Sequence, residues 1–255
     1  MRTIVVVPTY CEAENIIDVL GRIRGFAPEV DVLVVDDNSP DGTAEVALAV
    51  GRELGRVAVL RRPAKFGLGA AYRAGFERGL ADGYDVLVEM DADLSHDPAA
   101  LPQLLAAVRG GADVAIGSRY VEGGSIPDWP RHRRLLSSFG NRYASVLLGL
   151  GVADATSGYR AYRSDLLHRI DATSTHADGY GFQIELVHRA ARCGARIVEV
   201  PIAFRDRVRG TSKMSARIIA EAALLVVRLR AEDRGTTRRL VPAAGSAPAT
   251  VAARG

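Results

Sequence analysis

Cysteine is scarce in this chain of 255 residues, which contains only Cys11 and Cys193. The two lie far apart and lack the close spacing of paired metal ligands, so a cysteine-based metal centre is excluded. The start of the chain also lacks the pattern of a secretory signal, because residues 1–3 lead directly into a strand-like apolar run. These absences predict a reducing, cytoplasmic setting.

Strong charge and long apolar runs are missing as well. The formal net charge is only +3 and the pI is near 9.0, too mild to indicate nucleic-acid binding. The basic excess is concentrated late in the chain, around 205–213 and 228–239, which favours anionic ligands or lipid headgroups as partners. No apolar run approaches the roughly 20 residues that a membrane-spanning helix needs.

The composition, 48% hydrophobic and 25% charged, is that of a globular protein with one main domain. We assign residues 1–211 to that domain. Residues 212–234 have the pattern of an amphipathic helix that either packs on the core or lies in a membrane interface. Residues 235–255 lack periodicity and are expected to form a disordered tail.

Strand-like and helix-like segments alternate along the first half of the chain. Continuous β-branched apolar runs are typical of strands buried on both faces, and the stretches between them have helical periodicity. This alternation predicts an α/β fold with a Rossmann-like, mostly parallel sheet, helices on both faces, and ligands beyond the carboxyl ends of the strands. The expected strands are 3–7, 31–35, 56–60, 84–88, 113–117, 156–163 and 196–204, and the expected helices are 14–24, 43–54, 68–81, 99–108, one from 131, one from 179 and 212–232.

The strongest site signal is a pair of carboxylates, Asp91 and Asp93, which follows the apolar strand at 84–88. In an extended chain, residues two apart point to the same side, so both carboxylates can face one hard cation. Such oxygen ligands suit Mg²⁺ or Mn²⁺, ions that complete their shells with water and substrate phosphates. The alternative is an acidic turn that caps the next helix. It accounts for Asp97 and Pro98, a good N-cap and N1 pair, but leaves the carboxylate pair unexplained.

Other polar segments follow strands whose carboxyl ends share the same rim of the sheet. Residues 38–42 are rich in turn formers and can serve as a structural loop, whereas a carboxylate at Asp36 or Asp37 could read the donor edge of a base or ribose. Lys65 would supply a point charge for a diphosphate beside a weak glycine-loop signal. Several segments are thus expected to converge on one site.

Short motifs then occur in a jointly specific order along the chain. They are Pro8-Thr9-Tyr10-Cys11-Glu12, Asp36-Asp37-Asn38-Ser39-Pro40-Asp41-Gly42-Thr43, Lys65-Phe66-Gly67-Leu68-Gly69, Asp91-Ala92-Asp93-Leu94-Ser95-His96, Gly117-Ser118-Arg119-Tyr120, Thr156-Ser157-Gly158-Tyr159-Arg160 and Arg207-Val208-Arg209-Gly210-Thr211-Ser212-Lys213. With these motifs, roughly residues 3–215 resemble the inverting family 2 glycosyltransferases, and within them the dolichyl-phosphate or polyprenyl-phosphate mannosyltransferases. The resemblance implies a GT-A fold, a GDP-mannose donor and a polyprenyl phosphate acceptor.

The resemblance also implies roles for individual residues. On the nucleotide side it places Pro8, Tyr10, Glu12, Val35 and Asp37, with Lys65 nearby. The metal and diphosphate would be lined by Asp91, Ala92, Asp93 and Ser95, of which Asp91, Asp93 and Ser95 would hold Mg²⁺ or Mn²⁺. The donor and acceptor phosphates would be held by Arg119, Arg133, Ser137 and Arg207, with Lys213 beside them.

This sequence departs from the family pattern at two of these motifs. Cys11 replaces the usual asparagine of the first motif, so a contact through that side chain is not carried over. Ser95 stands where some members have glutamine, so a third protein ligand to the metal is expected to be weaker or water-mediated.

The residues themselves agree with a phosphate acceptor. A phosphate with a second pKa of about 6 is already a nucleophile, so no general base is required, and none stands out in the sequence. Arginines at 119, 133 and 207 can hold two anions together through forked hydrogen bonds. The cations at 131–134 point the same way, because a helix N-terminus disfavours positive charge unless an anion binds nearby. Direct attack by the phosphate would invert the anomeric carbon.

Two alternatives stay open at this point. A related transferase would use another nucleotide sugar, such as UDP-glucose, or a non-lipid acceptor, although a hydroxyl acceptor needs a base. A non-catalytic nucleotide-sugar-binding subunit would not need Asp91 and Asp93 for binding. Because a polyprenyl chain stays in the bilayer, we expect the protein to lie at the cytoplasmic face of a membrane, through the helix at 212–234 or a membrane partner protein.

Overall fold

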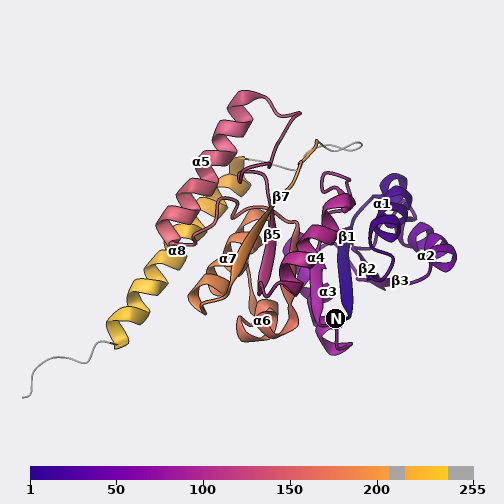
Figure 1. Ribbon diagram of the computed structural model, residues 1–255, viewed down its shortest axis with the longest axis horizontal. Coiled ribbons are helices and arrows are strands. Elements are labelled where there is room, and N and C mark those ends of the chain that lie inside the picture. Colours follow the sequence, from indigo (N-terminus) through magenta and orange to yellow (C-terminus); the bar gives the residue numbers. More distant parts are fainter. Residues whose placement is uncertain (207–215, 241–255) are drawn as a thin grey trace, which may run out of the picture.

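The computed structural model describes residues 1–206 and 216–240 (Figure 1). The strands are β1 (Thr3–Thr9), β2 (Asp31–Asp36), β3 (Val57–Arg61), β4 (Val86–Glu89), β5 (Val114–Ser118), β6 (Arg160–Arg163) and β7 (Ile197–Pro201). Within the described residues they form one sheet in the order β3-β2-β1-β4-β6-β5-β7. Only β6 runs antiparallel to its neighbours, β4 and β5. The sheet is therefore mostly parallel, as predicted.

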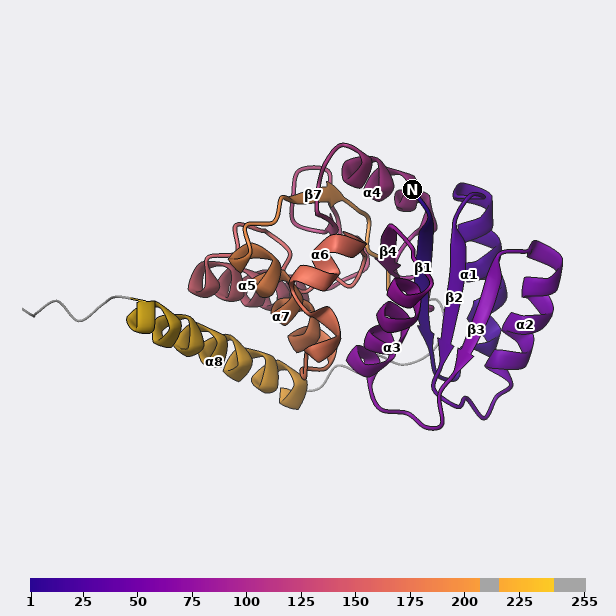
Figure 2. The same ribbon diagram turned by 90° about the horizontal axis from the view of Figure 1, so that it is seen from below.

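Helices cover both faces of this sheet (Figures 1 and 2). Residues of β1 alternate between two cores because successive side chains of a strand point to opposite faces. Val5 and Val7 pack with α1 (Ala13–Phe26), α2 (Thr43–Leu54) and α4 (Leu101–Arg109). Ile4 and Val6 belong to the core that contains α3 (Leu68–Ala81), α5 (Arg131–Leu148), α6 (Ser164–Arg169), α7 (Gly179–Arg192) and α8 (Ala216–Leu240).

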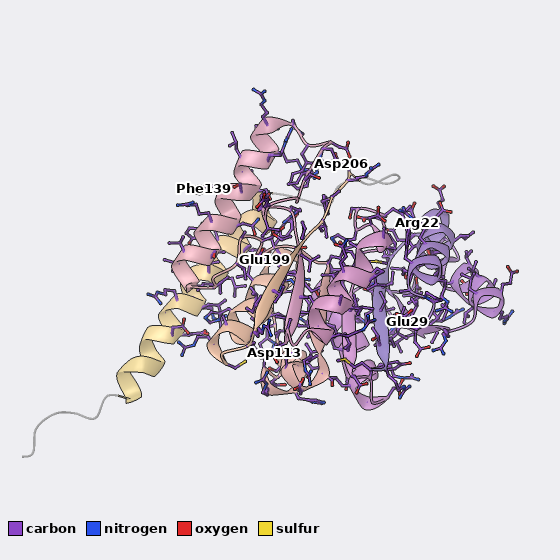
Figure 3. All side chains as sticks on the ribbon, in the orientation of Figure 1. Arg22, Glu29, Asp113, Phe139, Glu199 and Asp206 are labelled. Carbon is purple, nitrogen blue, oxygen red and sulfur yellow. The ribbon has the colours of Figure 1, made fainter. Side chains whose placement is uncertain are left out.

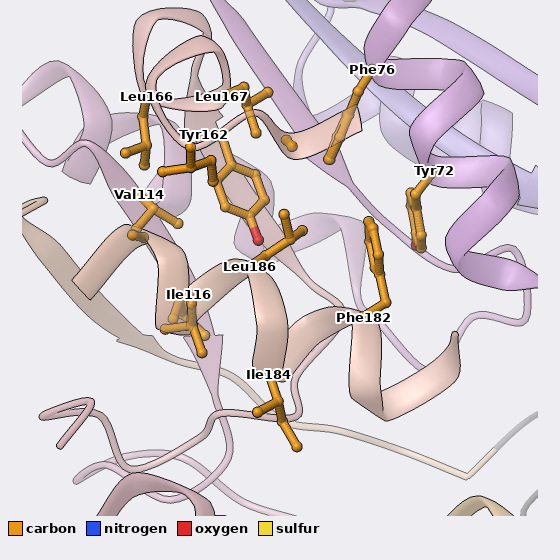
Figure 4. Packing of buried hydrophobic residues seen from close by; sticks show 14 of the residues in the cluster. Tyr72, Phe76, Val114, Ile116, Tyr162, Leu166, Leu167, Phe182, Ile184 and Leu186 are labelled. Atoms are coloured by element: carbon orange, nitrogen blue, oxygen red, sulfur yellow. The ribbon is translucent and has the colours of Figure 1, made fainter. Parts of the chain in front are cut away.

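Glycines let α3 lie close to the sheet. A Cβ at Gly75 would come within 2.3 Å of the Val6 Cγ1 atom, and one at Gly79 within 2.7 Å of Leu87 Cδ2. The preceding turn of α3 carries Tyr72, whose ring stacks on Phe182 of α7 with a centroid distance of 5.9 Å (Figure 4). The close approach of α3 thus brings Tyr72 beneath the carboxyl ends of β1 and β4.

Several element boundaries differ from the expectations. The strand expected at 156–163 begins only at Arg160, because β4 offers pairing partners only as far as Glu89. The strand expected at 196–204 ends at Pro201, opposite the end of β5. The helix expected at 99–108 starts as a 3₁₀ turn, Pro98–Ala100, and α6 and a second 3₁₀ turn, Ala172–Ser174, were not predicted. The predicted N-cap is confirmed, since the Asp97 carboxylate accepts from the Ala99 N–H at 2.9 Å.

The C-terminal helix also differs from its expected bounds. It continues to Leu240, into the segment expected to be a disordered tail. Its Asp233 pairs with His188 and Arg192 of α7, at 3.1 and 3.2 Å, which extends the docked part of the helix. Val226 and Leu229 are buried in the core shared with α5 and α7. No described helix is both long and apolar enough to cross a membrane.

Candidate active site

Two cavities meet at the carboxylate pair that follows β4. The larger has a volume of about 1070 Å³ and the smaller about 290 Å³, and Asp91 and Asp93 line both. Their walls come from the loops at the carboxyl ends of β1, β2, β3 and β4, from the segment before β6, and from α7 and α8. The predicted convergence of separate segments on one rim is therefore confirmed.

Asp91 is held from two sides. The Tyr72 hydroxyl donates to Asp91 Oδ1 at 2.9 Å, and the Asp91 N–H donates to Nδ1 of His96 at 3.2 Å. His96 is buried and stacks on Tyr159, with ring centroids 5.2 Å apart. Burial first, and then the nearby Asp91 carboxylate, raise the pKa of Tyr72 well above its ordinary value. The hydroxyl therefore stays protonated and remains a donor at neutral pH.

Asp93 is fixed by its own turn. The hydroxyl and N–H of Ser95 donate to Asp93 Oδ1 at 2.6 and 3.0 Å. Leu94, between them, has a φ of +62°, a conformation that is uncommon for residues other than glycine and that often marks functional sites. The Ser95 side chain thus orients Asp93.

The donor set fits a hard divalent ion with few protein ligands. Asp91 and Asp93 supply two carboxylates, and the described residues contain no cluster of three or more His, Cys, Asp or Glu side chains that could hold a metal. Mg²⁺ and Mn²⁺ suit such sites because water and substrate phosphates complete their coordination. A closed structural metal site is not what these residues form.

Beneath the pair lies a buried layer of ionisable residues that the sequence analysis missed. Glu89 and Arg160 face each other in the register of β4 and β6, and both are fully buried. Burial raises the pKa of Glu89 to about 8, against the opposing charge of Arg160. Arg160 donates to the carbonyl oxygens of Ala155, Ser157 and Gln183. It thereby fixes the loop whose Thr156 and Gly158 line both cavities.

The loop after β2 divides into structural and cavity-lining carboxylates. Asp36 accepts hydrogen bonds from the Ser39 hydroxyl at 2.6 Å and from the Thr9 hydroxyl, so its role is to stabilise the turn after β2. Asp37 lines the large cavity and pairs with Arg62 at 2.7 Å. Burial raises the pKa of Asp37, and Arg62 offsets only part of that effect. Arg62 is a further residue that sequence analysis did not single out.

Other residues predicted to lie on the nucleotide side also line the large cavity. Lys65 Nζ lies 3.9 Å from the centroid of the Tyr10 ring, and both residues line the large cavity. Asp178, which directly precedes α7, accepts from the Gly69 N–H at 2.9 Å and lines the same cavity. Residues of α8, among them Leu225, complete the wall.

Arginines line the smaller cavity. Arg119 is 6% exposed and makes a forked pair with the fully buried Asp154, with Nε and Nη2 each 2.7 Å from a carboxylate oxygen. Arg133 lies over the Trp129 ring at 3.8 Å and donates to Asp206 at 3.1 Å. Burial alone would raise the pKa of Asp154, but Arg119 lowers it below its ordinary value.

Most of the predicted site residues therefore lie together. The large cavity is lined by Pro8, Tyr10, Glu12, Asp37, Lys65, Asp91, Ala92 and Asp93, and the small one by Asp91, Asp93, Ser95, Arg119 and Arg133. Val35 is a core residue, and neither it nor Ser137 lines these cavities. Arg207 and Lys213 lie outside the described residues.

Known proteins are similar to this chain in sequence and in fold. The sequence model of the family described as Glycosyl transferase family 2 matches residues 4–171. The undecaprenyl-phosphate mannosyltransferase of Micrococcus luteus is 52% identical over 242 residues, which cover 94% of this chain and 99% of that protein. The polyprenol monophosphomannose synthase of Mycolicibacterium smegmatis is 53% identical over 225 residues, 87% of this chain and 84% of that protein.

A solved structure supports the fold. Glucosyl-3-phosphoglycerate synthase from Mycobacterium tuberculosis, in complex with Mn²⁺, uridine-diphosphate-glucose and phosphoglyceric acid, matches with a TM-score of 0.70 at 20% identity, covering 90% of this chain and 80% of that one. This likeness confirms the predicted GT-A fold. The family match and the two close relatives together show that the chain belongs to glycosyl transferase family 2.

Proposed function

We propose that the chain transfers mannose from GDP-mannose to a polyprenyl phosphate, with inversion at the anomeric carbon. The observation that carries the proposal is the meeting of two cavities at Asp91 and Asp93. One is large and lined by the nucleotide-side residues, and the other is small and lined by Arg119 and Arg133. The names of the two close relatives support mannose and a polyprenyl phosphate as the transferred group and acceptor.

The residues divide the chemistry between them. A phosphate dianion in the small cavity is already a nucleophile, because its second pKa is about 6. Arg133 would bind and orient it, and Arg119, held in place by Asp154, lies in the same wall. Mg²⁺ or Mn²⁺ held by Asp91 and Asp93 would neutralise charge on the departing diphosphate.

A lipid acceptor requires contact with a membrane, and α5 offers a suitable face. Its exposed residues include Leu135 (72% exposed), Phe139 (70%) and Val146 (73%), and Phe139 is labelled on the helix in Figure 3. Exposed basic residues, among them Arg134 and Arg142, lie on the same helix. An apolar face with flanking cations is typical of a helix at an anionic membrane surface.

The helix at 212–234 was predicted to be the membrane anchor. In the structure residues 216–234 of this segment belong to α8, and part of its apolar face packs against the protein core. Val226 and Leu229 pack against the core, whereas Leu224 and Val227 stay exposed. We therefore assign the membrane contact chiefly to α5, with α8 beside it (Figure 1). Flotation with anionic liposomes tests this assignment. Phe139→Glu should lose binding, while Ile17→Glu, at an apolar position on α1 that is 51% exposed, should keep it. Equal flotation of both variants would contradict the assignment.

The function itself is tested by a panel of nucleotide sugars with a short polyprenyl phosphate and mass detection of the lipid product. We expect product with GDP-mannose, and a mannosylated lipid of inverted configuration. Product only with another donor, such as UDP-glucose, would reassign the donor. Binding of nucleotide sugars without turnover under any condition would indicate a non-catalytic subunit.

A further inference from the structure

Tyr72 contacts the carboxylate pair from a helix that carries none of the predicted site residues. Its hydroxyl donates to Asp91 Oδ1 at 2.9 Å, although the residue itself is fully buried in the core. We propose that Tyr72 is a positioning residue that sets the orientation of the Asp91 carboxylate for the divalent ion. The inference rests on the proposed function, because it assigns a role within the proposed metal site.

The geometry allows Tyr72 little freedom. Its ring lies parallel to Phe182 of α7, with an interplanar angle of 2°, and is tilted against Phe76 at 6.3 Å (Figure 4). Gly75, one turn further along α3, holds this part of the helix against Val6 of β1. The hydroxyl position is therefore set by packing between α3, α7 and the sheet.

The Tyr72 hydroxyl holds Oδ1 of Asp91, and the other oxygen, Oδ2, lies 3.8 Å from Nδ1 of His96. The Asp91 side chain is partly exposed, so without the Tyr72 hydroxyl Oδ1 could turn toward water. A donor on Oδ1 removes that freedom and directs the group before an ion arrives. Residues that orient metal ligands in this way typically change metal affinity about 10–100-fold when removed.

The test compares two tyrosines that each bind an aspartate. Tyr72→Phe removes the hydroxyl and keeps the ring. Tyr84→Phe is the matched control, because the Tyr84 hydroxyl donates to Asp31 at 3.0 Å at the opposite end of the sheet. Mn²⁺ binding is measured with GDP present, from the electron paramagnetic resonance of free Mn²⁺, so neither lipid nor sugar transfer is needed. We expect about ten-fold weaker Mn²⁺ binding for Tyr72→Phe and no change for Tyr84→Phe.

A double-mutant cycle separates positioning from a general structural effect. If Tyr72 acts through Asp91, the variants Asp91→Asn and Asp91→Asn with Tyr72→Phe should bind Mn²⁺ equally weakly. Phe182→Leu, which keeps the hydroxyl but removes the stacked ring, should weaken Mn²⁺ binding to a smaller extent and serves if Tyr72→Phe does not fold.

Several results would overturn the inference. It would be overturned if Tyr72→Phe bound Mn²⁺ as tightly as the parent, or if Phe182→Leu did so where Tyr72→Phe does not fold. It would also be overturned if Tyr84→Phe lost as much Mn²⁺ affinity as Tyr72→Phe, or if the losses of Mn²⁺ affinity from Asp91→Asn and Tyr72→Phe were additive. A parent protein that binds no Mn²⁺ would contradict the metal site of the proposed function along with the inference.

Discussion

Replacing Asp154 by asparagine should destabilise the protein strongly. Asp154 is fully buried and accepts three hydrogen bonds from Arg119, two from the guanidinium at 2.7 Å and one from the backbone N–H at 3.0 Å. Asp154→Asn leaves a buried guanidinium without a counter-charge, which typically costs about 3–5 kcal/mol. At roughly 2–4 °C per kcal/mol for a domain of this size, the melting temperature should fall by about 6–20 °C.

The matched control is an exposed ion pair. Asp165 pairs with Arg163 at 3.0 Å, and both side chains are more than a third exposed. Asp165→Asn should cost no more than about 1 kcal/mol, because water screens such pairs. Calorimetry at neutral pH compares the two variants. Similar melting temperatures for the two variants would refute the reasoning that burial makes the Arg119–Asp154 pair contribute more to stability than an exposed pair.

The same pair predicts a pH dependence. Because Arg119 lowers the pKa of Asp154 below its ordinary value of 3.8, the ionised carboxylate stabilises the fold above that pH. This contribution is lost as the pH falls through the lower pKa of the folded state. The stability difference between the parent and Asp154→Asn should therefore narrow below about pH 4. A difference that stayed constant down to pH 2 would contradict this assignment.

Further predictions concern packing and the acceptor. Gly75→Ala should destabilise by about 1–3 kcal/mol in urea unfolding because its Cβ would overlap Val6. Gly21→Ala, with nothing within 4 Å of the new Cβ, should stabilise α1 by about 0.5–1 kcal/mol, and equal effects would contradict the close approach of α3. Arg133→Lys should raise the acceptor KM about ten-fold or more at unchanged donor KM, since lysine cannot make a forked contact. An unchanged acceptor KM would remove Arg133 from the acceptor site.

The sequence predicted the parallel part of the sheet because its signals are local. β-branched runs such as 3–7 and 31–35 mark buried strands wherever they occur. The cavity-lining residues at Tyr10, Asp37 and Asp91 were found for a related reason. Parallel strands bring the segments after them to one edge, so strand order did not need to be known.

The supporting residues could not be predicted in the same way. Asp154 and Arg62 become recognisable only through partners 35 and 25 positions away in the sequence. Tyr72 reads as an apolar-face residue of α3, and its hydroxyl gains a role only when the helix packs beneath Asp91. The antiparallel β6 was hidden because a short strand of alternating residues does not reveal its direction.

We propose that the large cavity binds the nucleotide sugar and the small cavity binds the acceptor phosphate, with the metal ion held between them by Asp91 and Asp93. One reaction tests this proposal. Mannose transfer from GDP-mannose to a short polyprenyl phosphate should be measured for the parent with Mg²⁺ or Mn²⁺, for the parent with a chelator, and for Asp91→Ala. We expect lipid-linked mannose only from the first reaction. Asp91→Ala should still fold, since Asp91 lies at the rim of the sheet, although the loss of its bond to the buried Tyr72 hydroxyl should lower the melting temperature somewhat. Full transfer in the chelator, or by a folded Asp91→Ala variant, would contradict the proposal.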